Sequence, residues 1–228
     1  MKIVPWSAEL HEWPSYQALR HGWPEFLLHD AVSNERWGSL FSEFPEFQFV
    51  AVEDGVAVAK GSSIPVNGTP AGWRDAFLSE GEPDRLCALE VLIAPDHHGR
   101  GLSRPLLEYM RGLAAARGWE LVAPVRPSWK ARYPLTPIER YAGWRRDDGL
   151  LYDPWLRAHE RLGAEVTGTA PAAMVVSGSV AEWQSWTDMV FPDSGSYVVP
   201  GALVPVEIDR ERDTGLYVEP CVWMRHRA

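Results

Sequence analysis

Cysteine is scarce in this chain. Cys87 and Cys221 are the only two among 228 residues, and they do not stand at the Cys-x-x-Cys spacing of a structural zinc site. Both lie in apolar stretches, so we expect buried free thiols, a reducing cytoplasmic setting and no metal site. Long apolar runs are also missing, since no window approaches the ~18 consecutive apolar residues of a membrane span. The N-terminus turns polar too early for a signal peptide, and we expect no membrane contact.

Basic residues are fewer than acidic ones, 22 against 31, which gives a formal net charge of −9. This balance argues against nucleic acid as a partner. It is compatible with a cationic amine as substrate, although solubility explains an acidic surface equally well. The sequence shows no internal repeat, low-complexity tract or linker, so the simplest organisation is one elaborated domain over residues 1–228. Nothing in it indicates an oligomeric state.

The first half of the chain has the pattern of an α/β sheet. Residues 47–52 and 56–64 are predicted strands, and the turn Glu53-Asp54-Gly55 between them is typical of a hairpin. Residues 86–94 are predicted to form a buried strand, residues 102–117 a helix with one apolar face, and residues 120–125 another strand. A strand, a helix and a strand in this order predict a βαβ unit with two parallel strands.

The second half begins with a long insertion, residues 126–152, of the kind that is usually functional or disordered. Within it, Thr136-Pro137-Ile138-Glu139 has the pattern of a capping box and predicts a short helix. Asp153, followed by Pro154, predicts the start of a second helix. The further elements expected downstream are a helix over 179–188 and strands over 202–208 and 216–225.

The stretch from His98 to Ser103, His-Gly-Arg-Gly-Leu-Ser, has the strongest functional signal. It lies between a predicted strand and a predicted helix, so free backbone N–H groups gather at the positive end of a helix, where an anion binds. Gly99 and Gly101 let the backbone approach a phosphate without a Cβ in the way, and Arg100 and Arg104 add positive charge. An ordinary tight turn is the alternative. The spacing differs from the G-x-G-x-x-G dinucleotide fingerprint and from a P-loop.

The run from Val91 to Ser103 resembles the central motif of the GNAT superfamily, the CoA-dependent N-acyltransferases, which have Gln/Arg-x-x-Gly-x-Gly/Ala at this turn. His98 stands where that family has Gln or Arg, Gly101 matches, and Ser103 takes the last small position. The resemblance implies a central mixed, twisted sheet with helices on both faces. It also implies acetyl-CoA or another acyl-CoA as co-substrate.

The same resemblance implies where acyl-CoA binds. The central strands of GNAT proteins splay apart and the pantetheine arm lies between them, so Leu92, Ile93 and Ala94 would make its contacts here. Lys130 and Arg132 are candidates for binding the 3′-phosphate. The turn residues that would hold the pyrophosphate are His98, Gly99, Arg100, Gly101, Leu102 and Ser103.

Two ionisable residues are candidates for proton transfer. Glu90 is the one ionisable residue in the strand at 86–94, where GNAT enzymes frequently have a general base. Residues 158–164, Ala-His-Glu-Arg-Leu-Gly-Ala, resemble a pattern in which that family places a tyrosine as general acid. His159 would then protonate the leaving thiolate, because a histidine can carry a proton near neutral pH. The alternatives are a Glu90 paired with an arginine and a His159 that serves packing alone.

The acceptor site in this family is formed by its variable parts, which here are the N-terminal helices and the insertion. A bulky aromatic lining favours a small or medium metabolite over a protein tail. The resemblance thus implies direct acyl transfer to an amine of such a metabolite in a ternary complex. A non-catalytic acyl-CoA sensor, O-acylation and decarboxylation stay open as alternatives. The candidate lining residues are Trp23, Phe26, Trp37, Tyr133, Tyr141 and Trp144.

Overall fold

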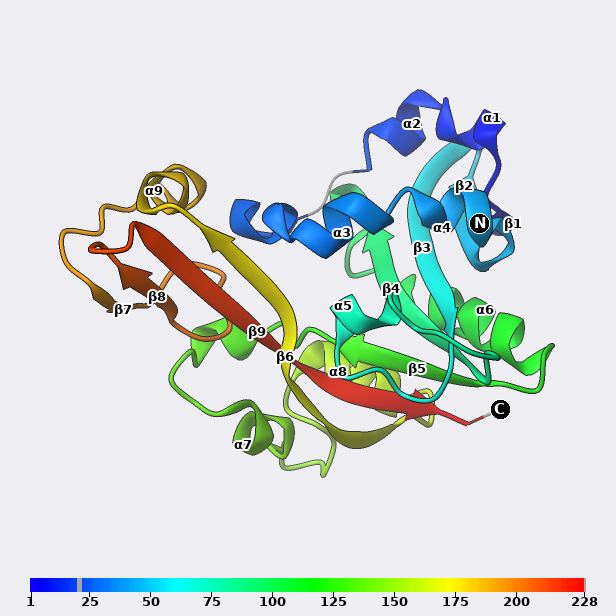
Figure 1. Ribbon diagram of the computed structural model, residues 1–228. Helices are drawn as coiled ribbons and strands as arrows, with labels where there is room; N and C mark the ends of the chain where they lie inside the picture. Colours follow the sequence, from blue (N-terminus) through cyan, green and yellow to red (C-terminus); the bar gives the residue numbers. More distant parts are fainter. Residues whose placement is uncertain (20–21, 228) are drawn as a thin grey trace.

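The computed structural model describes residues 1–19 and 22–227. The strands in these ranges form one sheet in the order β1-β2-β3-β4-β5-β9-β8-β7, and β6 pairs with the other edge of β9 (Figure 1). The strands are β1 (Lys2–Pro5), β2 (Gln48–Glu53), β3 (Val56–Val66), β4 (Arg85–Ile93), β5 (Glu120–Val125), β6 (Glu165–Gly178), β7 (Gly195–Tyr197), β8 (Val206–Asp209) and β9 (Thr214–His226).

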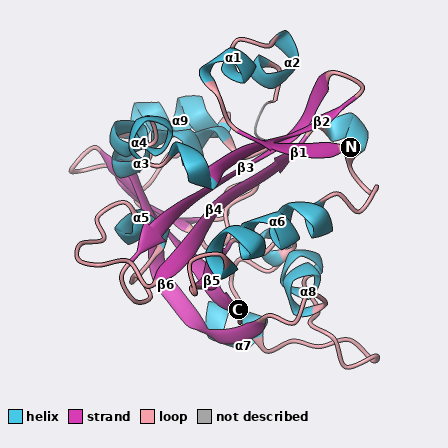
Figure 2. Ribbon diagram, turned by 90° about the vertical axis from the view of Figure 1, so that its right-hand side faces the viewer, coloured by secondary structure: helices cyan, strands magenta, loops and turns pink. Residues whose placement is uncertain are grey.

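Helices cover both faces of the sheet. In Figure 2, α6 and α8 lie on one face, and α3, α4 and α9 lie on the other. The predicted fold class, a mixed sheet with helices on both faces, is therefore confirmed. None of the described helices is long and apolar enough to cross a membrane. The α-helices are α1 (Ala8–His11), α2 (Pro14–Gln17), α3 (Ala31–Arg36), α4 (Ser39–Glu43), α5 (Trp73–Ala76), α6 (Ser103–Ala115), α7 (Ile138–Ala142), α8 (Pro154–Glu160) and α9 (Val180–Thr187), and the 3₁₀ helices are η1 (Glu25–His29), η2 (Pro45–Phe47), η3 (Pro95–His97) and η4 (Lys130–Arg132).

The predicted strand–helix–strand unit is confirmed. β4 and β5 are neighbouring parallel strands, whereas the other paired strands are antiparallel. The helix α6 connects them and packs against both. Such a crossover is the standard way to join two parallel neighbours, because the chain must return to the same end of the sheet. The buried residues of α6 belong to its predicted apolar face: Leu106, Leu107, Met110 and Ala114.

Local signals identified several element starts correctly. Asp153 caps α8 by accepting from the N–H groups of its first turn, and Ser179 and Glu182 form the capping box of α9. The capping box predicted at Thr136 is wrong. In the described chain α7 begins after Pro137, and no side chain caps it.

The sequence did not predict β6, the longest strand. Gly168 and Pro171 interrupt it, and glycine and proline within a run argue against a strand. The structure accommodates them because β6 pairs only with β9, and its register shifts near both residues. A strand that pairs on one edge can tolerate bulges that a central strand cannot.

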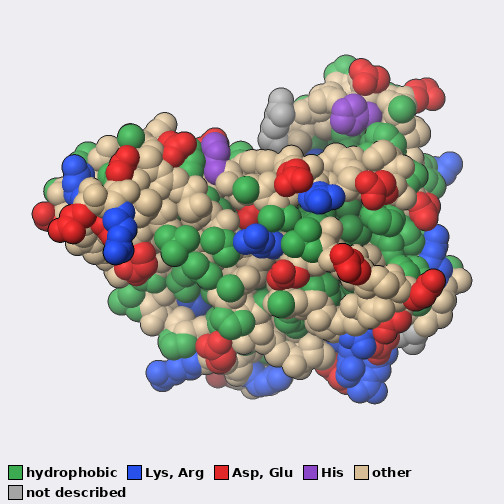
Figure 3. All heavy atoms as spheres, in the orientation of Figure 1, with side chains coloured by type: hydrophobic (Ala, Val, Ile, Leu, Met, Phe, Trp, Pro, Cys, Tyr) green, Lys and Arg blue, Asp and Glu red, His purple; other side chains and the backbone are tan. Residues whose placement is uncertain are grey.

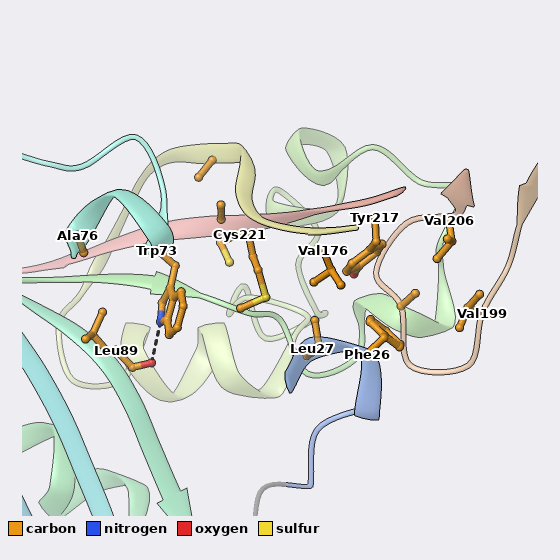
Figure 4. Packing of buried hydrophobic residues seen from close by; sticks show 14 of the residues in the cluster. Phe26, Leu27, Trp73, Ala76, Leu89, Val176, Val199, Val206, Tyr217 and Cys221 are labelled. Atoms are coloured by element: carbon orange, nitrogen blue, oxygen red, sulfur yellow. Dashed lines mark hydrogen bonds between the residues drawn. The ribbon is translucent and has the colours of Figure 1, made fainter. Parts of the chain in front are cut away.

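The hydrophobic core has a large cluster on each face of the sheet. One lies under α6, and the other brings together aromatic residues from distant segments, including Phe26, Trp73 and Tyr217 (Figure 4). The indole N–H of Trp73 donates to the carbonyl of Leu89 at 3.1 Å, which fixes α5 against β4. On the surface in Figure 3, hydrophobic side chains gather between the left-hand end, formed by β7 and β8, and the middle of the molecule.

Candidate active site

A cavity of about 300 Å³ opens where β4 and β5 part. Their parallel pairing ends at Cys87 and Val122, and beyond it residues 88–91 and 123–125 line the cavity from either side. Pro124, within the lining of β5, has no N–H to donate, which helps to explain why the ladder between the strands ends there. The backbone of β4 is thus left without a strand partner along this edge.

A bulge in β4 contributes to the separation. Ser62 of β3 lies opposite Glu90 and Ser63 lies opposite Ala88, so Leu89 is an extra residue in β4. A bulge bends its strand, increases the local twist and re-aims side chains, and such bulges are common beside active sites. Here the extra residue leaves both Leu89 and Glu90 in the cavity wall.

The cavity has walls on both faces of the sheet. Leu107, Trp155 and His159 line it from α6 and α8, which cover one face (Figure 2). On the other face it is lined by Trp23, Leu27 and Trp73. The cavity therefore passes through the sheet, in the gap between β4 and β5.

Glu90 is a buried carboxylate in the wall of this cavity, with only 4% of its surface exposed. Among the described residues, Lys60 of β3 places its Nζ 3.6 Å from Oε2. Lys60 also lies over the ring of Tyr16, 5.6 Å from its centroid. Burial and the nearby charge of Glu90 raise the pKa of Tyr16 to about 12, so the phenol stays protonated. The carboxylate is thus held in the wall by a compensating charge.

His159 lies in the opposite wall, on α8, and is bonded to a second buried histidine. Its Nδ1 is 2.9 Å from Nε2 of His226, near the end of β9. Burial and the neighbouring His226 lower the pKa of His159 to about 3. Our expectation that His159 carries a proton near neutral pH is therefore wrong, since both rings are neutral there. Among the described residues, Nε2 of His159 has no hydrogen-bond partner.

The glycine turn has the backbone geometry of an anion site. Gly99 and Gly101 have φ values of +75° and +76°, a conformation that glycine adopts without strain, and a Cβ at either position would point into open space. Leu102 occupies the N-cap of α6, and within the described chain no side chain caps this helix. In the first turn Pro105 has no N–H and the N–H of Arg104 donates to the carbonyl of Gly101 at 3.3 Å, so among the described residues the N–H of Ser103 is left for an external anion.

The charged side chains of the turn are more engaged than expected. Arg100 forms two hydrogen bonds with Glu53 at 2.9 and 3.0 Å, and this contact lowers the pKa of Glu53. Arg104 pairs with Glu108 at 2.9 Å. The ring of His98 turns back to the carbonyl of Ile93 at 2.9 Å. An anion at the turn would therefore be bound mainly by backbone N–H groups, because the charged side chains are engaged in contacts within the protein.

No protein-family model matches the chain. The chain is 33% identical over 245 aligned residues to the arginine N-acetyltransferase avaD of Aspergillus versicolor. The alignment covers 90% of this chain and 84% of that protein. The loading GNATL domain of CurA from Lyngbya majuscula shares the fold with a TM-score of 0.65 and 19% identity, over 99% of this chain and 96% of its own. The GphF GNAT-like decarboxylase in complex with isobutyryl-CoA also shares the fold, with a TM-score of 0.60 and 16% identity. The match covers 100% of this chain and 99% of that chain.

The chain belongs to the GNAT superfamily. It is an acyl-CoA-dependent N-acetyltransferase, and acyl-CoA is its co-substrate. The two solved structures show the fold alone.

The contacts expected for the pantetheine arm stay a prediction in this GNAT domain, and their three residues are not part of the cavity wall. The residues of β4 that line the cavity are 88–91, upstream of the predicted Leu92, Ile93 and Ala94. Leu92 packs beside Tyr16 in a separate small cluster, and the N–H of Ala94 already donates to the carbonyl of Val58 at 2.9 Å. The bulge moves the separation of the strands towards the start of β4.

The residues predicted to line the acceptor site lie in different parts of the structure. Trp23 lines the cavity, and Trp37 stacks behind Trp73 with ring centroids 6.0 Å apart. Phe26 is a core residue, packed on Trp183 and Tyr217. The three aromatic residues of the insertion do not line the cavity but pack against one another and Tyr152: Tyr133, Tyr141 and Trp144.

Of the two candidates for the 3′-phosphate, Lys130 needs correction and Arg132 stays a prediction. Lys130 is fully buried, and its Nζ donates to the carbonyls of Leu203 and Tyr133 at 2.6 and 2.9 Å. Burial lowers its pKa. Arg132 lies over the ring of Trp129, 4.6 Å from the centroid. Lys130 therefore serves the packing of the insertion and cannot reach a phosphate.

Sequence reasoning missed several residues of the cavity wall. Arg126 follows β5 and pairs with Glu219 of β9, and Trp73 and Trp155 supply aromatic surface. Arg126 and Glu219 are 93 positions apart, so no local pattern could have joined them. An arginine directly after a predicted strand of the βαβ unit was the one available signal.

The two cysteines are buried free thiols, as predicted. Cys221 lines the cavity, but burial raises the pKa of its thiol, and that of Cys87, well above the ordinary value. A protonated thiol is a poor nucleophile. No group of three or more His, Cys, Asp or Glu side chains in residues 1–19 and 22–227 could hold a metal ion.

The buried histidine pair predicts a loss of stability on acidification. Burial, with Arg111 nearby, lowers the pKa of His226 to about 4, and that of His159 is about 3. Both folded values lie below the unfolded value of about 6.5, so the unfolded state binds more protons as the pH falls below 6.5. Each histidine then costs about 2 kcal/mol of stability between pH 7 and pH 5.

Urea unfolding at pH 7 and pH 5 checks this. His226→Gln should lose about 2 kcal/mol less than the wild type over this interval, because one titrating group is gone. His11→Gln, which removes an exposed histidine, is the matched control and should behave like the wild type. Equal losses in His226→Gln and the wild type would contradict the buried neutral pair.

Proposed function

We propose that this enzyme transfers an acetyl group from acetyl-CoA directly to an amine of arginine or a similar small metabolite. The observation that carries the proposal is the cavity that passes through the sheet between β4 and β5, with Glu90 in one wall and His159 in another. Its volume is at the lower end of the range for small-molecule sites, which favours a metabolite over a protein tail. The acceptor class follows the name of the 33% identical relative.

The residues present fit acyl-CoA. The glycine turn leaves open space at the positions where a Cβ would obstruct a pyrophosphate. The edge of β4 that is not paired with β5 can form backbone hydrogen bonds with an extended pantetheine arm. When bound, acyl-CoA supplies the acyl group as a thioester. The N–H groups along the β5-facing edge of β4 would polarise its carbonyl.

Glu90 would act on the attacking amine, and His159 on the leaving sulfur. Glu90 takes the proton of the attacking amine, directly or through water, while the nitrogen–carbon bond forms and the carbon–sulfur bond breaks. His159 is neutral and therefore stabilises the leaving sulfur as a hydrogen-bond donor through Nε2–H, not as an imidazolium acid. This role requires the tautomer in which Nδ1 of His159 accepts from Nε2–H of His226. The thiolate then takes its proton from water.

Gly101 and Gly118 allow a matched test of the cofactor turn. They lie at opposite ends of α6 with φ values of +76° and +71°, and a Cβ would meet nothing within 4 Å at either position. Alanine should therefore destabilise the fold similarly at both, by about 1–2 kcal/mol. Only Gly101→Ala should weaken acetyl-CoA binding, by about tenfold, the worth of one charge-assisted hydrogen bond.

Calorimetric titration with acetyl-CoA measures the affinities, and urea unfolding measures the stabilities. Equal affinities in Gly101→Ala and Gly118→Ala would place the pyrophosphate away from this turn.

The function itself is tested by thiol release from acetyl-CoA with arginine and a panel of amines. Glu90→Gln should lower kcat by about 10²–10⁴ and leave the affinity for acetyl-CoA nearly unchanged, because general-base catalysis has that typical worth. Glu46→Gln, at an exposed glutamate 3.8 Å from Arg117, is the control and should keep the wild-type rate.

Three results would count against the proposal. Thiol release without any acceptor would indicate another reaction of acyl-CoA, and tight binding without turnover would indicate a sensor. A wild-type kcat in Glu90→Gln would remove Glu90 from proton transfer.

A further inference from the structure

Arg126 is the first residue after β5 and lies in the cavity wall. Its Nε donates to both carboxylate oxygens of Glu219, at 2.9 and 3.0 Å, and its Nη2 donates to the carbonyl of Gly201 at 2.6 Å. In the part of the chain that the structure describes, no hydrogen bond engages Nη1. The side chain is 24% exposed and lines the cavity, and Nη1 is not among the buried nitrogens that lack a partner, so it is open to a ligand.

The partner of Arg126 is itself held rigidly. Glu219 is 2% exposed, and the hydroxyl of Tyr217 donates to its Oε2 at 2.7 Å. Tyr217 in turn accepts from the N–H of Leu203 at 2.9 Å. This network ties the guanidinium to β9 and to the loop before β8. A buried ion pair is costly to desolvate and is weak evidence for stability, so its position in a ligand cavity favours a role in binding.

Two ion pairs lie at the cavity among the described residues. Lys60 compensates Glu90 on one side and Glu219 compensates Arg126 on the other. A purely cationic amine would add an unpaired positive charge to this site. An amino acid brings its own carboxylate, and that group can bond to the open end of a guanidinium while its amine points elsewhere.

We infer that Arg126 binds the carboxylate of the acceptor, so that the enzyme selects an amine that also carries a carboxylate, an amino acid in its ionised form. Glu219 and Tyr217 are positioning residues, because they orient the guanidinium and leave Nη1 towards the cavity. The C-terminal strands β8 and β9 thereby contribute to acceptor choice. This inference rests on the proposed function, since it names the acceptor class for the same cavity.

The experiment compares arginine with agmatine, which is arginine without its carboxylate, as ligands of the enzyme–CoA complex in calorimetric titrations. The wild type should bind arginine about 10–100-fold more tightly than agmatine, the worth of charge-assisted hydrogen bonds to one carboxylate. Arg126→Gln should abolish this preference and leave agmatine affinity unchanged. Arg126→Lys should lose most of it, because an ammonium lacks the planar fork.

Two further variants separate binding from folding. Arg126→Gln combined with Glu219→Gln removes both buried charges, so it avoids an unpaired carboxylate and should also lose the preference. Arg212→Gln, at an exposed arginine beside Asp209, should keep the full preference. Tyr217→Phe should reduce the preference without abolishing it.

The outcomes distinguish this inference from the proposed function. Equal affinities of the wild type for arginine and agmatine overturn the inference, even if thiol is released with both. A weaker affinity of Arg126→Gln for CoA, with the preference for arginine intact, also overturns it. A preference for arginine that disappears in Arg126→Gln supports it, and then an absence of thiol release counts against the proposed transfer reaction alone.

Discussion

Three residue pairs hold β4 and β5 together as parallel strands: Arg85 with Glu120, Leu86 with Leu121 and Cys87 with Val122. Beyond them the strands separate, and the rest of the active site depends on this separation. The bulge at Leu89 and the missing N–H of Pro124 both work against further pairing. An open strand edge is normally a liability, because its backbone groups lack partners. Here the edge faces a cavity where a ligand can satisfy them.

A single buried carboxylate, Asp153, connects the segments that follow β5. Asp153 accepts from the N–H groups of Ser128 and Trp129, which follow β5, and from those of the first turn of α8. It also accepts from the hydroxyl of Tyr141 at 2.8 Å. One side chain thus joins the exit of β5, the insertion and the helix that presents His159. The insertion therefore supports the cavity wall from behind, and its aromatic residues pack there as a core.

The parts of the site that the sequence predicted are those with local signals. The order of strand, glycine turn and helix is contiguous, and the apolar strand around Glu90 marks that residue as unusual. No local signal exists for residues that are distant in the sequence. His159 and His226 are 67 positions apart, and Arg126 and Glu219 are 93 positions apart. Aromatic composition also failed as a guide, because tryptophan and tyrosine fill cores and line pockets alike. Trp23 and Tyr141 have the same sequence character, and only the tertiary structure separates their roles.

The central claim is that the acyl donor and the amine meet in the cavity between β4 and β5. A crystal structure of the enzyme with CoA and arginine tests it most directly. The account predicts the sulfur inside the cavity, between Glu90 and His159, with the pyrophosphate on the N–H groups of residues 99–103. A pantetheine arm that lies outside the gap between the two strands, with the cavity closed to it, would contradict the account.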